Sequence, residues 1–340
     1  MIFEKIKFIK IPSNPPLVRE MMDFSRHFPI IGMEGQRKLG ESTVAVVGAG
    51  ALGSWEVYFL YKLGIGKIIV IDRDFVDESD LPRTIYTKED VGKPKVEALK
   101  ERFDNVVGYF EDLNPSTVNL LDEADLILDG TDNIYTRQVI NDYAIKMNKP
   151  WIYVGVLSTY GDVMPIIPGK TACFRCLMPK LPSRPMPTCA VAGIMSYVPP
   201  FAASLAVSLA TKILLGEEVR SELIFFDTKT LEFEKIEMPR KEDCPACVRK
   251  ELIFLKKQIR IERLCDGSIQ ITPPERMDID FDELAKRLKA LGIEYIKTSQ
   301  FIQFEDDYAE ILIFQGGRMV VRGVENEKEA KNFFARYLGG

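Results

Sequence analysis

Two closely spaced cysteine pairs are the most specific chemical signal in this 340-residue sequence. Cys173-Phe-Arg-Cys176 and Cys244-Pro-Ala-Cys247 supply four thiolates, which make up the ligand set of a closed tetrahedral zinc site. A zinc ion with four protein ligands has no open coordination position, so we expect a structural Zn²⁺ whose binding is coupled to folding. The alternative interpretation is an accidental arrangement of unrelated buried or redox-active cysteines.

Two further cysteines lie outside these pairs. Cys189 follows a proline-rich stretch at residues 177–188, whose composition is typical of an exposed loop. An accessible thiol at this point could act as a nucleophile, but a small buried side chain is an equally good interpretation. Cys265 has no partner in the sequence, and we expect it to be structural.

A glycine-rich turn is the second strong signal. Gly48-Ala-Gly50-Ala-Leu-Gly53 follows a predicted strand and opens a predicted helix. In such a turn Gly48 permits the tight bend, Gly50 lets the backbone approach a phosphate, and Gly53 allows close packing of helix and sheet. Asp72 ends the next predicted strand, where a carboxylate can accept a hydrogen bond from a ribose hydroxyl. The pattern predicts nucleotide binding but does not separate NAD from ATP.

Charged residues further along the chain favour ATP. Asp72-Arg-Asp74 is followed by Asp80-Leu-Pro-Arg83 and by Gly92-Lys-Pro-Lys95. A dehydrogenase needs one acid for the ribose and has no need of a second acid together with an arginine and a lysine. The cations Arg83 and Lys95 suit a triphosphate with several charges to neutralise. Taken singly, the two cations would be ordinary solvated surface charges.

A second loop follows the fourth predicted strand. Gly130-Thr-Asp132-Asn133 stands at the carboxyl end of the predicted sheet, where ligands bind in folds of this kind. Asp132 could hold Mg²⁺ against the phosphates. Its alternative role is that of a helix N-cap.

The elements that position these residues alternate between strand and helix. Apolar runs predict buried strands at 43–47, 67–72, 106–110, 125–129 and 151–156, with helices at 54–63, from residue 94, and at 135–147. This order predicts an α/β fold with a Rossmann-like, doubly wound, mostly parallel sheet. Strands at 162–167, 223–227 and 233–238 are separated by tight turns and predict an antiparallel extension that carries the zinc site.

We expect three segments in the chain. Residues 1–22 form an N-terminal extension, and residues 23–250 form the nucleotide-binding domain with its zinc site. Residues 251–340 are predicted to be a small α+β C-terminal domain, with strands at 268–272, 301–304, 309–314 and 318–322 and helices at 281–291 and 328–337.

The composition excludes several function classes. A net charge of −5 excludes nucleic-acid binding through bulk positive charge. A Ser-His-Asp hydrolase or a histidine-rich metal site would depend on the single histidine, His27. The N-terminus lacks the apolar region of a signal peptide, and the longest apolar run, at 201–215, is too short to span a bilayer. We therefore expect a cytoplasmic protein without a membrane partner.

In combination, the motifs resemble the MoeB/ThiF family, which is related to the adenylation domain of ubiquitin-activating enzymes. The resemblance covers about residues 20–250, and it also rests on Ser25-Arg26 and Gly35-Gln36. It implies that residues 23–250 form an ATP-binding adenylation domain. It further implies a homodimer that uses ATP and Mg²⁺ to adenylate the C-terminal glycine of a ubiquitin-like sulfur-carrier protein ending in Gly-Gly.

The resemblance also assigns roles to single residues. Asp72 would bind the ribose, Arg83 and Lys95 would contact the phosphates, and Asp132 would help to place Mg²⁺. Arg26 would reach into the ATP site of the partner subunit. These roles agree with the chemistry, because a carboxylate that attacks the α-phosphorus of ATP needs positioning and charge neutralisation more than a general base.

Cys189 matches the cysteine that bonds covalently to the carrier in some members of the family. In other members adenylation is the whole reaction, so both outcomes stay open for this chain. Because no rhodanese-like domain follows, we expect sulfur to come from another protein. The carrier could belong to a molybdopterin, thiamin, tRNA-thiolation or protein-conjugation pathway.

The sequence also departs from the family pattern. Asp80 stands where the family usually has Asn, Thr84 where it has Gln, and Asp23 where it has the first arginine of the N-terminal motif. The chain ends in Leu338-Gly339-Gly340, which is the ending of such carriers but also fits the C-cap of a helix.

Three other functions remain as alternatives. An NAD-dependent oxidoreductase is disfavoured by Arg83, Lys95 and the cysteine pairs. A tRNA-modifying dehydratase of the same fold is opposed by the negative net charge. A non-enzymatic partner that has lost ATP chemistry is opposed by the retained glycines, Arg26 and Asp132.

Overall fold

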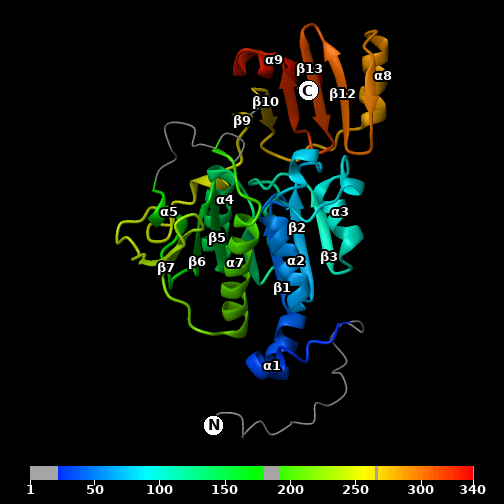
Figure 1. Ribbon diagram of the computed structural model, residues 1–340. Coiled ribbons are helices and arrows are strands. Elements are labelled where there is room, and N and C mark those ends of the chain that lie inside the picture. The colour runs from blue at the N-terminus through cyan, green and yellow to red at the C-terminus, as the bar shows by residue number, and fades with distance from the viewer. Residues whose placement is uncertain (1–21, 180–191, 265–266, 340) are drawn as a thin grey trace, which may run out of the picture. The chain divides into compact units, whose positions relative to one another are not determined.

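The computed structural model describes residues 22–179, 192–264 and 267–339, which fold into two compact units (Figure 1). The large unit contains the described residues up to Asp112 and those from Leu120 to Leu252. The small unit contains Leu113–Asn119 together with the described residues from Ile253 onward. The sequence does not indicate that residues 113–119 belong to the small unit.

An eight-stranded sheet forms the centre of the large unit, in the order β3-β2-β1-β4-β5-β6-β7-β8. The first five strands in this order are parallel and the last three antiparallel. The continuous Val and Ile runs of β1 and β2 are buried, as expected for strands covered on both faces. The strands are β1 (Thr43–Val47), β2 (Lys67–Asp72), β3 (Val106–Phe110), β4 (Leu126–Asp129), β5 (Trp151–Leu157), β6 (Tyr160–Ile166), β7 (Glu222–Asp227) and β8 (Glu232–Glu237).

Helices connect and cover these strands. In the large unit they are α1 (Phe28–Glu41), α2 (Gly53–Leu63), α3 (Lys95–Arg102), α4 (Ile134–Met147), α5 (Phe174–Leu177) and α7 (Val198–Leu215), with 3₁₀ turns η1 (Glu78–Asp80) and η2 (Lys88–Asp90). The 3₁₀ turn η3 (Val118–Leu121) begins among the residues of the small unit and ends among those of the large unit. Helices α2 and α7 pack against each other and share a hydrophobic core with the sheet. The mixed α/β fold with a mostly parallel sheet is therefore confirmed.

Helix α7 has 18 residues and a mean hydropathy of 1.6, so its length and composition would allow it to cross a membrane. It begins at Val198, before the apolar run seen in the sequence, because two prolines open it, and it ends at Gly216 in the left-handed conformation. The sequence estimate of its length was therefore too short. Its buried face packs on β5, β6 and α2, which is the environment of a core helix.

The small unit is built on a six-stranded antiparallel sheet in the order β11-β12-β13-β14-β10-β9. Its strands are β9 (Arg260–Arg263), β10 (Ile269–Thr272), β11 (Tyr295–Lys297), β12 (Phe301–Asp306), β13 (Ala309–Phe314) and β14 (Met319–Arg322). It also holds the 3₁₀ turn η4 (Ile253–Leu255) and the helices α8 (Phe281–Ala290) and α9 (Glu327–Leu338). The alternating apolar residues of β10 and β13 pack with α8 and α9 in one core.

The glycine that follows α9 caps this helix. Gly339 is the C-cap of this helix, and its N–H donates to the carbonyl oxygens of Phe334 and Ala335 at 3.1 and 3.2 Å. The helical C-cap interpretation of Gly339 therefore agrees with the structure, while Gly340 lies outside the described residues.

Candidate nucleotide and metal sites

The glycine-rich turn and the second loop meet at the carboxyl ends of β1 and β4. These strands are neighbours in the sheet, at the point where the strand order reverses and ligands bind in open α/β folds. Gly48 has φ +88°, and a Cβ atom added there would lie 2.6 Å from the carbonyl oxygen of Gly130. A Cβ atom on Gly53 would lie 1.8 Å from the carbonyl oxygen of Gly48. Only glycine allows this close approach of the two loops and the start of α2.

Gly50 differs from these two glycines, because a Cβ atom added to it would have no heavy atom within 4 Å. The backbone at Gly50 therefore faces open space beside the start of α2. This is the position at which the sequence predicts the approach of a phosphate, and the first N–H groups of a helix favour an anion there.

Asp72, at the end of β2, fixes the backbone of the glycine-rich turn. Its Oδ2 accepts the N–H of Ala49 at 2.6 Å, and its Oδ1 accepts the N–H of Asp74 at 2.7 Å. Burial and the charge of Asp74 raise the pKa of Asp72 to about 6, while Lys95 acts in the opposite direction. Tyr86, which sequence reasoning missed, donates from its hydroxyl to the carbonyl oxygen of Ala49 at 2.8 Å. A carboxylate has further lone pairs, so Asp72 can still accept from a ribose.

The predicted phosphate-binding cations lie beside this carboxylate. The Nζ atom of Lys95 is 3.5 Å from Oδ2 of Asp80 and 3.9 Å from Oδ2 of Asp74. Nη2 of Arg83 donates to Oδ1 of Asp80 at 2.9 Å. Burial lowers the pKa of Lys95, but the surrounding carboxylates outweigh it and raise this pKa overall, so the ammonium stays charged. The structure thus gathers five of the predicted site residues into one charged cluster.

The loop after β4 presents Asp132 to solvent. The N-cap of α4 is Asn133, whose Oδ1 accepts the N–H of Thr136 at 2.8 Å. The alternative role of Asp132 as a helix cap is therefore wrong. Its carboxylate projects from a loop in backbone contact with the glycine-rich turn.

Arg137 holds this loop from inside and was not found from the sequence. Its Nε donates to Oδ2 of Asp129 at 2.8 Å, and its Nη2 donates to the carbonyl oxygens of Thr131 and Val154 at 2.6 and 2.8 Å. Its guanidinium also lies 5.0 Å from the ring centre of Tyr153. The one sequence signal for this role is its position four residues after the N-cap Asn133. From there a helical side chain points back towards the loop that precedes the helix.

Glu56 is a second residue that the sequence did not mark. It is fully buried on α2, and neither carboxylate oxygen has a hydrogen-bond partner among the described residues. Burial raises its pKa well above the ordinary value, and the charge of Asp129 adds to this effect. An acid in the first turn of a helix normally interacts with the helix dipole, so the sequence pattern gives no hint of a buried carboxyl group.

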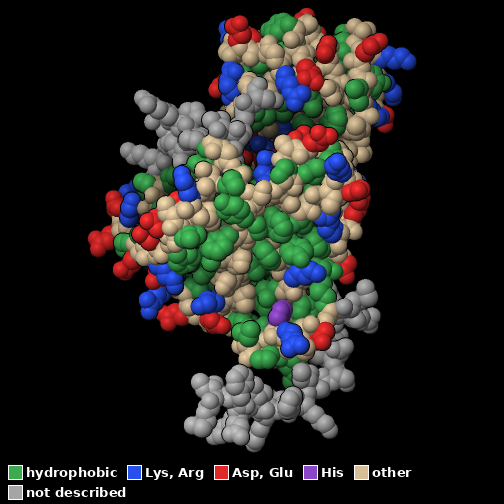
Figure 2. All heavy atoms as spheres, in the orientation of Figure 1, with side chains coloured by type: hydrophobic (Ala, Val, Ile, Leu, Met, Phe, Trp, Pro, Cys, Tyr) green, Lys and Arg blue, Asp and Glu red, His purple; other side chains and the backbone are tan. Residues whose placement is uncertain are grey.

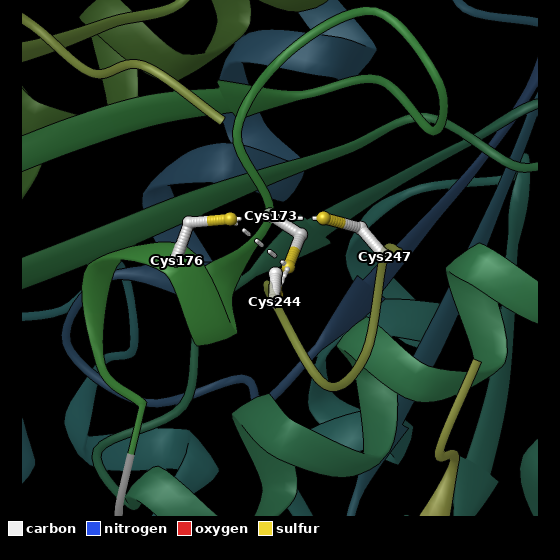
Figure 3. Close-up of side chains that lie close together, drawn as sticks. All are labelled: Cys173, Cys176, Cys244 and Cys247. Carbon is white, nitrogen blue, oxygen red and sulfur yellow. Dashed lines mark hydrogen bonds between the residues drawn. The ribbon is translucent and has the colours of Figure 1, made fainter. Parts of the chain in front are cut away.

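The four predicted zinc ligands converge, as Figure 3 shows. The Sγ–Sγ distances are 3.8 Å for Cys173–Cys176, 3.6 Å for Cys173–Cys244 and 3.6 Å for Cys176–Cys247. Zn–S bonds of about 2.3 Å in a tetrahedron place sulfur atoms about 3.8 Å apart, so the cluster has the size of a zinc site. The hydrogen bond between Cys173 and Cys176 raises the pKa of Cys173 and lowers that of Cys176 to about 4.

Three predicted residues are not part of these clusters. Arg26 is exposed immediately before α1, which leads into the amino end of β1, whereas the glycine-rich turn follows its carboxyl end. Cys189 and Cys265 lie outside the described residues.

Fold and site together define a nucleotide-binding α/β protein with a four-cysteine cluster. The model of the ThiF family matches residues 24–246, and the chain belongs to this family.

Comparisons with known proteins agree with this assignment. The chain is 32% identical over 327 residues to the sulfur carrier protein ThiS adenylyltransferase of Bacillus subtilis, a match covering 92% of this chain and 97% of the relative. It is 34% identical over 235 residues to a sulfur carrier protein adenylyltransferase of Thermus thermophilus, covering 64% and 87%. A crystal structure of Escherichia coli MccB with ATP matches with a TM-score of 0.53 and 26% identity, covering 63% of this chain and 68% of that one.

Proposed function

We propose that this protein is an adenylyltransferase that uses ATP to activate the C-terminal glycine of a ubiquitin-like sulfur-carrier protein. The observation that carries the proposal is the cluster of Asp72, Asp80, Arg83 and Lys95 beside the glycine-rich turn. It is supported by the match to a ThiS adenylyltransferase along nearly the whole length of both chains. The match to MccB with ATP supports the choice of nucleotide.

The reaction joins two anions. An oxygen of the carrier's terminal carboxylate attacks the α-phosphorus of ATP, the bond from this phosphorus to the bridging oxygen breaks, and pyrophosphate leaves with the bonding electrons. Lys95 and Arg83 lower the repulsion by neutralising phosphate charge, and the N–H groups at the start of α2 bind phosphate oxygens. Asp72 holds the ribose, so that the α-phosphorus is fixed relative to the incoming carboxylate.

Asp132 is the residue that we expect to hold Mg²⁺. It is exposed on a loop in contact with the glycine-rich turn, and Arg137 fixes the backbone of that loop through the carbonyl oxygen of Thr131. Mg²⁺ prefers carboxylate and phosphate oxygens and would neutralise phosphate charge when bound.

The cysteine cluster fits a structural zinc site. All four thiols are buried, their spacing matches a tetrahedral ion, and no protein ligand position remains open for substrate. Zn²⁺ would tie α5 to the turn that follows β8, so its contribution is to folding and not to the reaction.

A homodimer would complete the site. Ile30 and Met33 of α1 are 83% and 47% exposed, and Figure 2 shows hydrophobic side chains gathered over α2 and α7. Because α1 lies at the end of the sheet opposite the glycine-rich turn, Arg26 is poorly placed to serve the nucleotide of its own chain (Figure 1). We propose that it serves the nucleotide of a second copy, as an arginine finger does.

Further steps belong to the same proposal. After adenylation, the Cys189 thiol would lose its proton and attack the carbonyl carbon of the acyl-adenylate, forming a thioester and displacing AMP. A separate protein would donate sulfur. The relatives point to thiamin and molybdenum-cofactor pathways as sources of the carrier. The reaction would take place in the cytoplasm.

Carrier-dependent exchange of labelled pyrophosphate into ATP tests the proposal. We expect exchange with a ubiquitin-like carrier ending in Gly-Gly and none with the same carrier lacking its last glycine. Asp132→Ala should abolish exchange without loss of the fold, whereas Cys189→Ala should spare it, because the thiol acts after adenylation. Absence of exchange with every such carrier would refute the proposed function.

A further inference from the structure

Asp80 is a buried carboxylate placed between the two cations of the nucleotide site. Its Oδ1 accepts a hydrogen bond from Nη2 of Arg83 at 2.9 Å, and its Oδ2 lies 3.5 Å from Nζ of Lys95. The side chain is only 6% exposed. Both oxygens therefore contact groups that a triphosphate would also need.

The position of Asp80 is fixed independently of these cations. Its Oδ2 accepts the N–H of Asp77 at 3.1 Å, and Asp77 accepts the N–H of Ser79 in return, so that the two acids close η1 as a capping box. The carboxylate cannot move away from Arg83 and Lys95 without breaking this turn. Carboxylate and phosphate oxygens accept charge-assisted hydrogen bonds from guanidinium and ammonium groups in the same way.

We propose that Asp80 is an internal substitute for a phosphate group. It holds Arg83 and Lys95 in their binding positions before a nucleotide arrives, and it competes with phosphate oxygens for the same donors afterwards. Its fixed negative charge thus weakens the affinity for ATP and for pyrophosphate and assists release of pyrophosphate after adenylation. The inference rests on the proposed ATP-dependent function, but it concerns phosphate affinity alone.

Asp80→Asn removes the charge at nearly constant shape and tests the inference on the full chain. We expect the dissociation constants of Mg-ATP and of inorganic pyrophosphate, measured by titration calorimetry, to fall about tenfold or more. The variant removes a negative charge that contacts both phosphate-binding cations and repels the phosphate. Adenosine, which has no phosphate, should bind with unchanged affinity. Tighter binding cannot result from misfolding, so a structural role alone would not produce this gain.

Asp77→Asn is the matched control, because it removes the same charge from the same turn. Asn keeps the cap on the N–H of Ser79, and Asp77 is exposed and makes no ion pair with either cation within the described residues. We expect its dissociation constants to change by less than about threefold, since solvent screens the exposed charge. An equal gain in both variants would overturn the inference, because bulk charge would then explain it.

The inference would also be overturned if Asp80→Asn bound pyrophosphate no more tightly than the wild-type protein does. If this variant fails to fold, Asp80→Ser provides a second neutral side chain for which the same gain is expected. Failure of carrier-dependent exchange together with tighter pyrophosphate binding by Asp80→Asn would refute the proposed function alone. Absence of pyrophosphate binding by both the wild-type protein and Asp80→Asn would refute the inference that Asp80 competes with phosphate groups.

Discussion

Glu56→Gln should stabilise the large unit in a pH-dependent way. Glu56 is fully buried without a hydrogen-bond partner among the described residues, and burial raises its pKa well above the ordinary value of 4.5. Above pH 4.5 the unfolded chain loses this proton and the folded chain keeps it. Stability therefore falls as the pH rises from the unfolded towards the folded pKa, by about 1.4 kcal/mol per pH unit.

The glutamine side chain of this variant would be neutral in both states and of nearly the same shape as protonated Glu56. The difference in unfolding free energy between Glu56→Gln and wild type should therefore be small near pH 4.5. It should grow as the pH rises above this value, with a limiting slope of about 1.4 kcal/mol per pH unit, and level off above the folded pKa of Glu56. Urea unfolding followed by tryptophan fluorescence is a suitable assay, because both tryptophans, Trp55 and Trp151, lie in the large unit.

The control for this measurement is Glu101→Gln, whose side chain is 61% exposed beside Lys93. An exposed ion pair contributes little, so we expect a difference below about 1 kcal/mol at every pH. A Glu56→Gln difference that does not change with pH would refute the reasoning, since Glu56 would then ionise equally in both states. A destabilising effect at pH 7 would refute it as well.

Three further changes test other parts of the structure. Cys244→Ser should abolish stoichiometric zinc binding and lower the melting temperature of the large unit by about 5 °C or more; full zinc content in metal analysis would contradict the tetrahedral site. Arg137→Lys keeps the charge but loses the guanidinium that bonds two carbonyl groups. The free energy of unfolding in urea should therefore fall by about 2 kcal/mol, and the KM for Mg-ATP in the exchange assay should rise. An unchanged KM would show that Arg137 does not position the Asp132 loop. Leu113→Asp should destabilise the small unit by about 3 kcal/mol or more and increase its proteolysis, whereas the exposed Asn119→Asp should not; equal proteolysis of the two variants would contradict the burial of Leu113.

Local patterns predicted much of the fold because they report directly on burial. The apolar runs predict β1, β2 and β3 to the residue. Strands β1 and β2 have a partner strand on each side and are buried along nearly their whole length, whereas β3 is a partly buried edge strand. By contrast, β9 and β11 were missed. They are edge strands of three or four residues, and β11 is exposed along its whole length, so the neighbouring strand and not their own sequence defines them.

The site shows the same division between local and distant causes. The cysteine pairs and the glycine-rich turn follow from spacing alone, because each motif is a local structure. The roles of Arg137 and Glu56 do not follow from spacing. The bond from Arg137 to Asp129 and the burial of Glu56 without a hydrogen-bond partner among the described residues depend on how α2, α4 and β4 pack. The cap of α4 at Asn133 instead of Asp132 is a shift of one residue, but it leaves Asp132 available for a cation.

Part of the connection between β3 and β4 belongs to the small unit. The connection from β3 to β4 contains residues 113–119, which fold with the small unit; Leu113 and Thr117 are buried, and Ser116 donates to the carbonyl oxygen of Pro274. Strand β4 carries Asp129 and leads directly into Asp132. Removing the residues after Leu252 would therefore leave this connection without its packing partners. The match to the ThiF family ends at residue 246, yet residues 113–119, which lie inside the matched range, fold with residues that lie beyond it.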